Sequence, residues 1–131
     1  DKTLKKKEWR TSEDQLHRNF GPARIYFYDN GDIERKEWYK NGERHREDGP
    51  ADIKYDLNGK KLEELWSQNG EPFRKDGPAH ILYDLNGDVI DADYYFLEGK
   101  LISKYVYEKH IENKNAITES KSFLKIKLVL K

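Results

Sequence analysis

Short segments of alternating apolar and polar residues, each followed by an Asn-Gly pair, run through most of the chain. In residues 51–57, alanine, isoleucine, tyrosine and leucine take every second position, and aspartate or lysine lies between them. A period of two predicts β-strands with one apolar face, and a two-residue Asn-Gly loop predicts a tight type I′ reversal. The pattern therefore predicts antiparallel β-hairpins joined into a meander.

The hairpins repeat at a step of 28 residues, which separates the Gly-Pro-Ala triplets at Gly21, Gly49 and Gly77. A fixed period of this kind indicates an array of similar supersecondary units. We predict a repeat domain over residues 9–102. Its units are 9–35, 36–63 and 64–91, with a partial unit at 92–102. Trp9 is one residue out of phase, and the turn "TSEDQ" near it lacks Asn-Gly, as expected of a terminal unit.

The Asn-Gly loops also predict a register. Counting outward from Asn58-Gly59 gives the pairs Leu57–Lys60, Tyr55–Leu62, Ile53–Glu64 and Ala51–Trp66. Counting from Asn69-Gly70 and from its equivalent one unit earlier gives the pairs Trp66–Phe73, Leu65–Arg74, Trp38–His45 and Glu37–Arg46. The Asp-Gly-Pro triplets read as a turn or bulge within a strand, where glycine permits the kink and proline withholds a ladder donor.

The register predicts two faces, because directly opposed residues share a face. The apolar face collects Trp38, Trp66, Tyr94, Ala51, Ile53, Tyr55, Ala79, Ile81, Tyr83, His45 and Phe73. The other face collects Arg46, Arg74, Glu37, Asp52, Lys54, Asp56 and Asp84. A single sheet cannot bury its own aromatic face, so we expect tail elements, sheet curvature or a partner to cover it.

The two ends differ from the repeats. Residues 1–8 form a basic leader, which we interpret as a solvated tail, with a phosphate-binding arm as the alternative. Residues 103–131 are expected to form a cap, with a helix over 103–113 and a strand in which Leu124, Ile126, Leu128 and Leu130 alternate with lysines, although the same residues could form a helix. The predicted fold is thus mainly β: an elongated, twisted single sheet with a short C-terminal helix and a final strand.

Composition limits the classes of function. The chain has 131 residues, 35% apolar, 38% charged and 13% aromatic, and its 25 basic and 25 acidic residues cancel. A neutral balance speaks against nucleic-acid binding, which favours a basic excess. The absence of Cys fits a reducing, cytoplasmic compartment, and no apolar run is long enough to span a membrane. The chain also lacks Met, so we expect that it begins after the initiator of a longer protein.

Neither catalysis nor metal binding is predicted. The chain has no Cys nucleophile, no nucleophile elbow and no Gly-rich phosphate loop before a helix. His17, His45, His80 and His110 are not spaced as a zinc site, and His45 shares its repeat position with Phe73 and so is expected to act as a flat packing group. We therefore expect no enzyme and no cofactor.

The pattern "W-x-x-N-G-x-x-H-R-x-D-G-P-A" resembles the MORN-like hairpin repeats, above all the YwqK-type and the phage or giant-virus variants. The resemblance covers residues 9–100 and departs from the pattern in the first unit, where "RNFGPA" stands. It implies a scaffold for binding or assembly. On it rests the expectation of a viral or phage accessory protein that inhibits a host protein in the host cytoplasm, or of an antitoxin that neutralises a cognate toxin.

The candidate binding residues form two sets that recur every 28 residues, which we call columns. The arginine column is Arg18, Arg46 and Arg74, and the aromatic column is Trp38, Trp66 and Tyr94. An open aromatic strip could bind a larger protein partner, since such residues dominate interface hot spots. The arginines could instead hold a small anionic ligand or a lipid headgroup, or could form a repeated structural ion pair with Glu37, Asp48 or Asp76. An exposed sheet edge or an open aromatic face could also support a homodimer.

Overall fold

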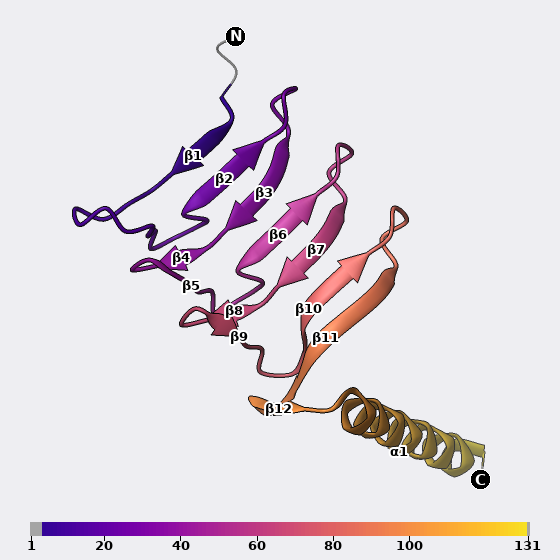
Figure 1. The fold of residues 1–131 in the computed structure, drawn as a ribbon. Coiled ribbons are helices and arrows are strands. Elements are labelled where there is room, and N and C mark those ends of the chain that lie inside the picture. The colour runs from indigo at the N-terminus through magenta and orange to yellow at the C-terminus, as the bar shows by residue number, and fades with distance from the viewer. Residues whose placement is uncertain (1–3, 131) are drawn as a thin grey trace.

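A computed structural model describes the backbone of residues 4–130 and the side chains of residues 4–125. The predicted fold class is confirmed: one long antiparallel sheet is followed by a C-terminal helix (Figure 1). In spatial order the eight strands are β1 (Lys6–Glu8), β2 (Arg24–Phe27), β3 (Ile33–Glu37), β6 (Asp52–Tyr55), β7 (Lys61–Leu65), β10 (Gly77–Tyr83), β11 (Val89–Leu97) and β12 (Lys100–Ile102).

Two small hairpins leave this sheet. They are β4 (Tyr39–Lys40) with β5 (Glu43–Arg44), and β8 (Ser67–Gln68) with β9 (Glu71–Pro72). Their Asn-Gly turns are type I′, as predicted, because Asn41 and Asn69 have φ of 50° and 52° and each following glycine has φ of 82°. The main sheet is therefore interrupted once per unit, at the tryptophan.

The departure of these hairpins corrects two predicted pairs. Leu65 does not face Arg74, since it pairs with Asp52 and His80. Glu37 likewise does not face Arg46, because both of its neighbours, Arg24 and Asp52, belong to the main sheet. The count assumed one continuous ribbon, whereas the chain turns out of the sheet between β3 and β4 and again between β7 and β8.

The other Asn-Gly pairs form a different turn from the one predicted. Asp56 N–H donates to the Lys60 carbonyl (2.8 Å), so the loop consists of Leu57, Asn58 and Gly59 rather than two residues. The side chain of Asp56 accepts the N–H groups of Asn58 and Lys60, which favours this longer loop. The predicted pairs nearest the turn, Leu57–Lys60 and Tyr55–Leu62, are therefore wrong.

A bulge after Lys54 restores the predicted register further from that turn. Tyr55 pairs with Lys61, but Ile53 pairs with Glu64 as predicted. Ile53 also lies opposite Lys36, and Glu64 lies opposite Ile81, so these residues form one row across the sheet. The extra residue in the loop and the bulge offset one another, which keeps the apolar positions on one side.

We call the side that carries Ile53, Ile81, Trp38 and Trp66 the tryptophan face. The Trp66 indole N–H donates to Glu64 Oε2 (3.4 Å), and Ala51 and Ala79 beside the indoles have no exposed surface. Packing a small residue next to an indole lets the ring lie over the neighbouring strand. The core of this sheet is thus thin, and its fully buried side chains are mostly alanines.

We call the opposite side the charged face. Its two central rows are Arg24, Glu37, Asp52, Leu65 and His80, and Tyr26, Arg35, Lys54, Glu63 and Leu82. The prediction that Glu37, Asp52 and Lys54 share this face is confirmed. The prediction that Arg46 lies here is wrong, since its guanidinium stacks on Trp38.

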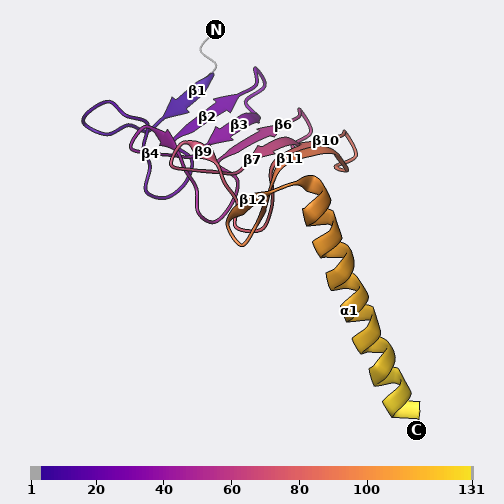
Figure 2. The ribbon, with the colours of Figure 1, turned by 60° about the horizontal axis from the view of Figure 1, so that its bottom comes forward.

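The last element is one helix, α1 (Lys104–Leu130), which extends away from the sheet (Figure 2). The predicted helix end at 113 and the predicted strand over 124–130 are therefore wrong. Alternating leucines and lysines fit a helix as well as a strand, and Ser103 begins this helix by accepting the N–H of Val106. Tyr107 packs against Tyr95 of β11 with ring centroids 5.1 Å apart.

Candidate partner-binding groove

An arginine stacks on a tryptophan in each of the three units. The guanidinium carbons of Arg18, Arg46 and Arg74 lie 3.9, 4.0 and 4.1 Å from the ring centroids of Trp9, Trp38 and Trp66. A planar cation over an indole face is attracted by the ring quadrupole. We refer to these pairs as the Arg–Trp clamps.

Each clamp also fixes the Gly-Pro turn that follows it. The arginine Nη1 donates to a carbonyl oxygen four residues later, and the acceptors are Pro22, Pro50 and Pro78, at 3.2, 3.0 and 3.0 Å. A Cβ on Gly49 would lie 2.7 Å from the Arg46 guanidinium carbon. Glycine is therefore needed here because the guanidinium lies directly against the backbone of the turn.

Histidines join the first unit to the second and the second unit to the third. His17 Nδ1 accepts the N–H of Asn41 (2.9 Å), and His45 Nδ1 accepts the N–H of Asn69 (3.0 Å). The N–H of Arg46 also donates to the Ser67 carbonyl (3.0 Å). His45 thus does more than the predicted packing role, because it links its own loop to the hairpin of the following unit.

A groove of about 580 Å³ lies between the arginine loops of the first and second units. It is lined by residues 17–21 and 45–48 from these loops and by residues 38–40 between them. The clamp residues Arg18, Trp38 and Arg46 all contribute to its surface. Three of the six predicted binding residues therefore meet at one concave site.

The first unit departs from the repeat at this groove. Phe20 takes the position of Asp48 and Asp76 in the later units, and it is 88% exposed. In the second unit, Asp48 Oδ1 accepts from Arg46 Nε (3.0 Å). Within residues 4–125, no carboxylate oxygen lies within 4.0 Å of Arg18, although Arg18 makes the same stacking and carbonyl contacts as Arg46.

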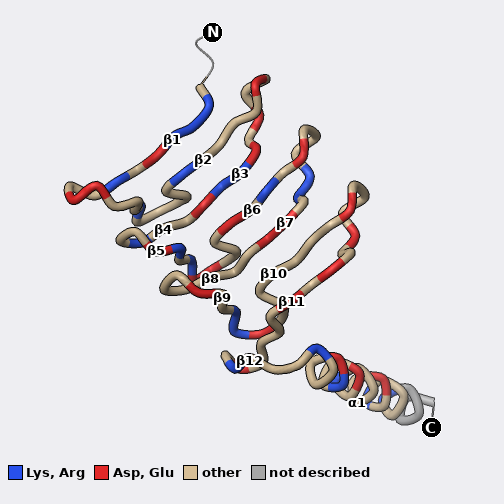
Figure 3. The backbone as a smooth tube through the Cα atoms, viewed as in Figure 1, with Lys and Arg blue, Asp and Glu red and all other residues tan. Residues whose placement is uncertain are grey.

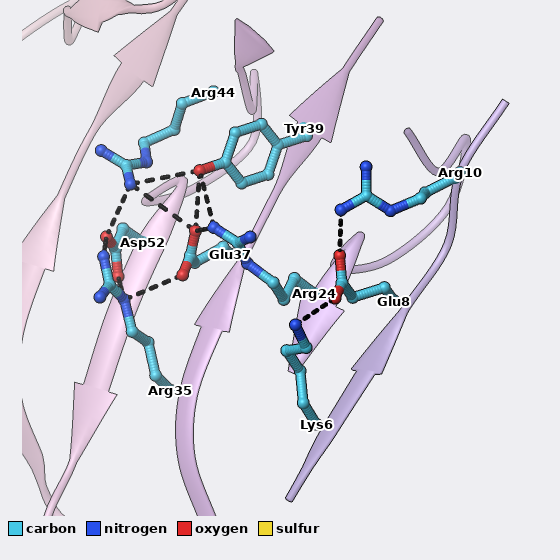
Figure 4. Close-up of polar contacts among 9 residues, drawn as sticks. All are labelled: Lys6, Glu8, Arg10, Arg24, Arg35, Glu37, Tyr39, Arg44 and Asp52. Carbon is cyan, nitrogen blue, oxygen red and sulfur yellow. Dashed lines mark hydrogen bonds and ion pairs between the residues drawn. The ribbon is translucent and has the colours of Figure 1, made fainter. Parts of the chain in front are cut away.

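A dense charged network supports the groove from the charged face (Figure 4). At its centre is Glu37, which is 1% exposed. Glu37 Oε2 accepts from Arg24 Nη2 (2.9 Å) and from the hydroxyl of Tyr39 (2.8 Å). Tyr39 also lines the groove, so the network fixes one of the groove's aromatic rings.

Two further arginines complete the network. Arg35 Nε lies 3.2 Å from Glu37 Oε1, but it donates its hydrogen to Asp52 Oδ1 (2.9 Å). Arg44, on the β4–β5 hairpin, reaches Glu37 and Asp52 at 3.6 and 3.4 Å. These ion pairs tie the β4–β5 hairpin, whose residues 39–40 line the groove, to the main sheet.

The network alters the ionisation of its members. Burial acts to raise the pKa of Glu37, but hydrogen bonds from Arg24 and Tyr39 and the charge of Arg35 outweigh it and hold this pKa below its usual value. Burial and the hydrogen bond to Glu37 raise the pKa of Tyr39, so its hydroxyl stays a donor at neutral pH. The groove is therefore supported by a carboxylate that stays charged.

The remaining predicted binding residues lie outside this groove. Arg74 and Trp66 form the third clamp, one unit further along the sheet. Tyr94 breaks the column, since it sits on β11 with φ of 55° and is 44% exposed. It has no arginine clamp among the described residues, and the structure does not bring it to the other five.

Sequence reasoning missed the contributions of Phe20 and Tyr39 and the network around Glu37. The available signal was the departure from the repeat. Leu65 stands in the next unit where Glu37 stands here, and Pro72 stands where Arg44 stands. The clamp residues repeat from unit to unit, whereas Phe20, Glu37 and Arg44 do not, and this departure from the repeat is the signal that marks the groove.

The described part of the chain holds no group of three or more His, Asp or Glu side chains arranged to bind a metal ion. Among the same residues, no helix has the length and apolar character that crossing a membrane requires. No protein-family model matches the chain, and neither a curated protein nor a solved structure is significantly similar to it. The groove is therefore interpreted from its own geometry.

Proposed function

We propose that this protein is a non-enzymatic interaction module that binds a larger protein partner at the groove between its first two units. The observation that carries the proposal is Phe20, a phenyl ring 88% exposed on the rim of a concave, aromatic-floored site. Aromatic residues at the centre of a contact supply much of the binding energy of protein interfaces.

The arrangement around Phe20 supports this role. The clamps hold the groove loops against the tryptophans of the sheet, and the charged network holds Tyr39. A preformed site of this kind loses less conformational entropy on binding. The clamp arginines already use a carbonyl oxygen and an indole face each, which favours a scaffolding role for the column over a small-ligand site. We extend the proposal to inhibition of the bound partner on the strength of the resemblance to viral repeat proteins alone.

The proposal is tested by affinity capture from a lysate of the source cells. The immobilised wild type is compared with Phe20→Asp, which restores the residue found in the other two units, and with Leu85→Asp as a matched control. Leu85 is 70% exposed in the turn between β10 and β11, so the control makes the same kind of change away from the groove.

We expect the wild type and Leu85→Asp to retain the same stoichiometric protein and Phe20→Asp to lose it. Circular dichroism of all three proteins checks that the sheet is intact. A wild type that retains no protein, or a partner that Phe20→Asp retains equally, contradicts the proposal.

A further inference from the structure

We infer that the groove recognises an acidic segment of its partner, in which a carboxylate binds Arg18 and a neighbouring apolar side chain packs on Phe20. This inference rests on the proposed function and names the chemistry of the partner. It concerns only the junction between the first and second units.

The carboxylate of the partner segment is inferred from the contacts of Arg18 and Arg46, the equivalent arginines of the first and second units. Arg46 and Arg18 both stack on a tryptophan and both donate Nη1 to a proline carbonyl. The Nε of Arg46 then donates to Asp48 at 3.0 Å. At Arg18 the corresponding residue is Phe20, which cannot accept, so this Nε–H lacks the carboxylate that Arg46 holds. In the third unit the corresponding Asp76 accepts the N–H of Glu98 (2.8 Å), so within the described residues the ion pair is made by the second unit. A carboxylate from outside would complete the arrangement with a charge-assisted hydrogen bond.

The apolar side chain of the partner segment is inferred from Phe20, which stands where the later units have aspartate. Phe20 removes an acceptor and places an exposed ring at the groove beside the Trp38 and Tyr39 positions. A segment with a carboxylate and an adjacent apolar side chain satisfies both changes together. A carboxylate alone leaves the ring exposed, and an apolar side chain alone leaves Arg18 without its ion pair.

The charge around the groove agrees with an acidic segment. Three cations line it (Arg18, Lys40 and Arg46) against two anions (Glu47 and Asp48), so the net charge is 3 − 2 = +1 with both histidines neutral. Asp48 is already paired with Arg46, and the other lining carboxylate, Glu47, is 77% exposed and has its Oε1 3.5 Å from His45 Nε2.

The far end of the sheet has the opposite charge. Residues 76–98 contain six carboxylates and no Lys or Arg, and Figure 3 shows this acidic hairpin at β10 and β11, whereas basic and acidic residues are mixed on β1 to β3. The six are Asp76, Asp84, Asp88, Asp91, Asp93 and Glu98. An acidic segment is repelled from that end, whereas the first two units, residues 9–63, have 11 basic and 12 acidic residues and so are almost neutral. The repulsion thus favours the groove end of the sheet over the far end.

The inference is tested by NMR on the full ¹⁵N-labelled chain. The probes are the blocked peptide acetyl-Asp-Phe-Asp-amide, its neutral counterpart acetyl-Asn-Phe-Asn-amide, and inorganic phosphate. The readout is the Nε–Hε resonance of each arginine, because Arg46, whose Nε already holds Asp48, serves as an internal control for Arg18.

We expect the acidic peptide to shift the Arg18 resonance saturably and to leave Arg46 nearly unchanged. Loss of a charge-assisted hydrogen bond should make the neutral peptide at least about tenfold weaker. In Phe20→Asp, whose local sequence matches units that fold, the peptide should no longer shift Arg18. Phe20→Ala removes the ring but adds no carboxylate beside Arg18, so the peptide should still shift the Arg18 resonance but bind more weakly.

Three results overturn the inference: an Arg18 resonance that does not respond to the acidic peptide, equal affinity for the neutral peptide, or unchanged binding by Phe20→Asp. If phosphate shifts Arg18 at the same concentration as the peptide, the apolar half of the inference is wrong. If lysate capture still depends on Phe20 while the peptide fails, the proposed function stands and only the acidic chemistry is rejected.

Discussion

Arg46 stacks on Trp38 with its guanidinium carbon 4.0 Å from the ring centroid, and the same guanidinium holds the carbonyl of Pro50. The pair connects a main-sheet strand end to the turn that begins the next strand. Since three units repeat it, the arginine column is part of what stabilises each unit. Function is then better sought where one unit departs from the others.

Replacing Arg46 by lysine tests the clamp. Lysine keeps the charge but loses the planar stack and the fixed donors to Pro50 and Asp48. We expect the free energy of unfolding to fall by about 1–3 kcal/mol, measured by urea denaturation followed by far-ultraviolet circular dichroism. Lys40→Ala is the control, and an equal effect of the two substitutions would contradict the clamp.

Replacing Gly49 by alanine tests the close approach of the guanidinium. Gly49 does not have a left-handed φ, so any cost comes from a new methyl group 2.7 Å from the Arg46 guanidinium carbon. We expect alanine to destabilise the wild type by about 1 kcal/mol or more. In an Arg46→Ala background the same substitution should cost less, and a double-mutant cycle measures this coupling. Strictly additive effects would show that the two groups do not meet.

Replacing His45 by phenylalanine tests the link between units. The third unit already carries Phe73 at this position, so the ring should fit, but the acceptor for the Asn69 N–H is lost. We expect hydrogen exchange of the Asn69 amide to become about tenfold faster. The free energy of unfolding of the whole protein should fall by at most about 1 kcal/mol. The Asn41 amide, bonded to His17, should keep its rate in the same sample. Unchanged exchange at Asn69 would exclude the link.

Stability should depend on pH through Glu37. Its pKa is lowered in the folded state, so its contribution is present above the unfolded value of about 4.3 and is lost as pH falls through the lower folded value. The free energy of unfolding of the wild type should therefore decrease as pH falls below about 4.3. Glu37→Gln should be less stable at neutral pH by about 2 kcal/mol and should lose less on acidification.

The control for this prediction is Glu34→Gln, an exposed glutamate on the same strand. Chemical denaturation at a series of pH values from about 7 to about 3 gives the free energy of unfolding as a function of pH for the wild type and for each variant. A Glu37→Gln protein with the same acid dependence as the wild type would show that the network does not hold a charged carboxylate.

The architecture of the sheet could be predicted because its determinants are local. Alternation places Ile53 and Ile81 on one side, and Asn-Gly at Asn41 and Asn69 specifies type I′ turns. The turns around Asn58 differ because the Asp56 side chain binds two backbone N–H groups and stabilises a longer loop. The same dipeptide thus forms two kinds of turn, and the longer loop also forms at Asn30-Gly31, where Tyr28 N–H donates to the Asp32 carbonyl (2.8 Å).

The candidate site could be predicted only in part, because a side chain's partner depends on three-dimensional contacts. Counting along the strands assigned Arg46 to the side of Glu37, but the chain turns away at Trp38 and brings Arg46 back over the indole. The helix end was missed for a related reason. Alternating leucine and lysine suit a strand only where a neighbouring strand is available, and α1 extends away from the sheet (Figure 2).

The groove belongs to the seam between two units and to neither unit alone, and this affects how the array can change. A copy of the second unit inserted further along would lengthen the ribbon without creating another such pocket, since the new seam would bring an aspartate of its own. Under the proposed function, exchanging a single loop residue at another seam would create a second binding site. Such a ribbon would then bind a second partner without a new domain.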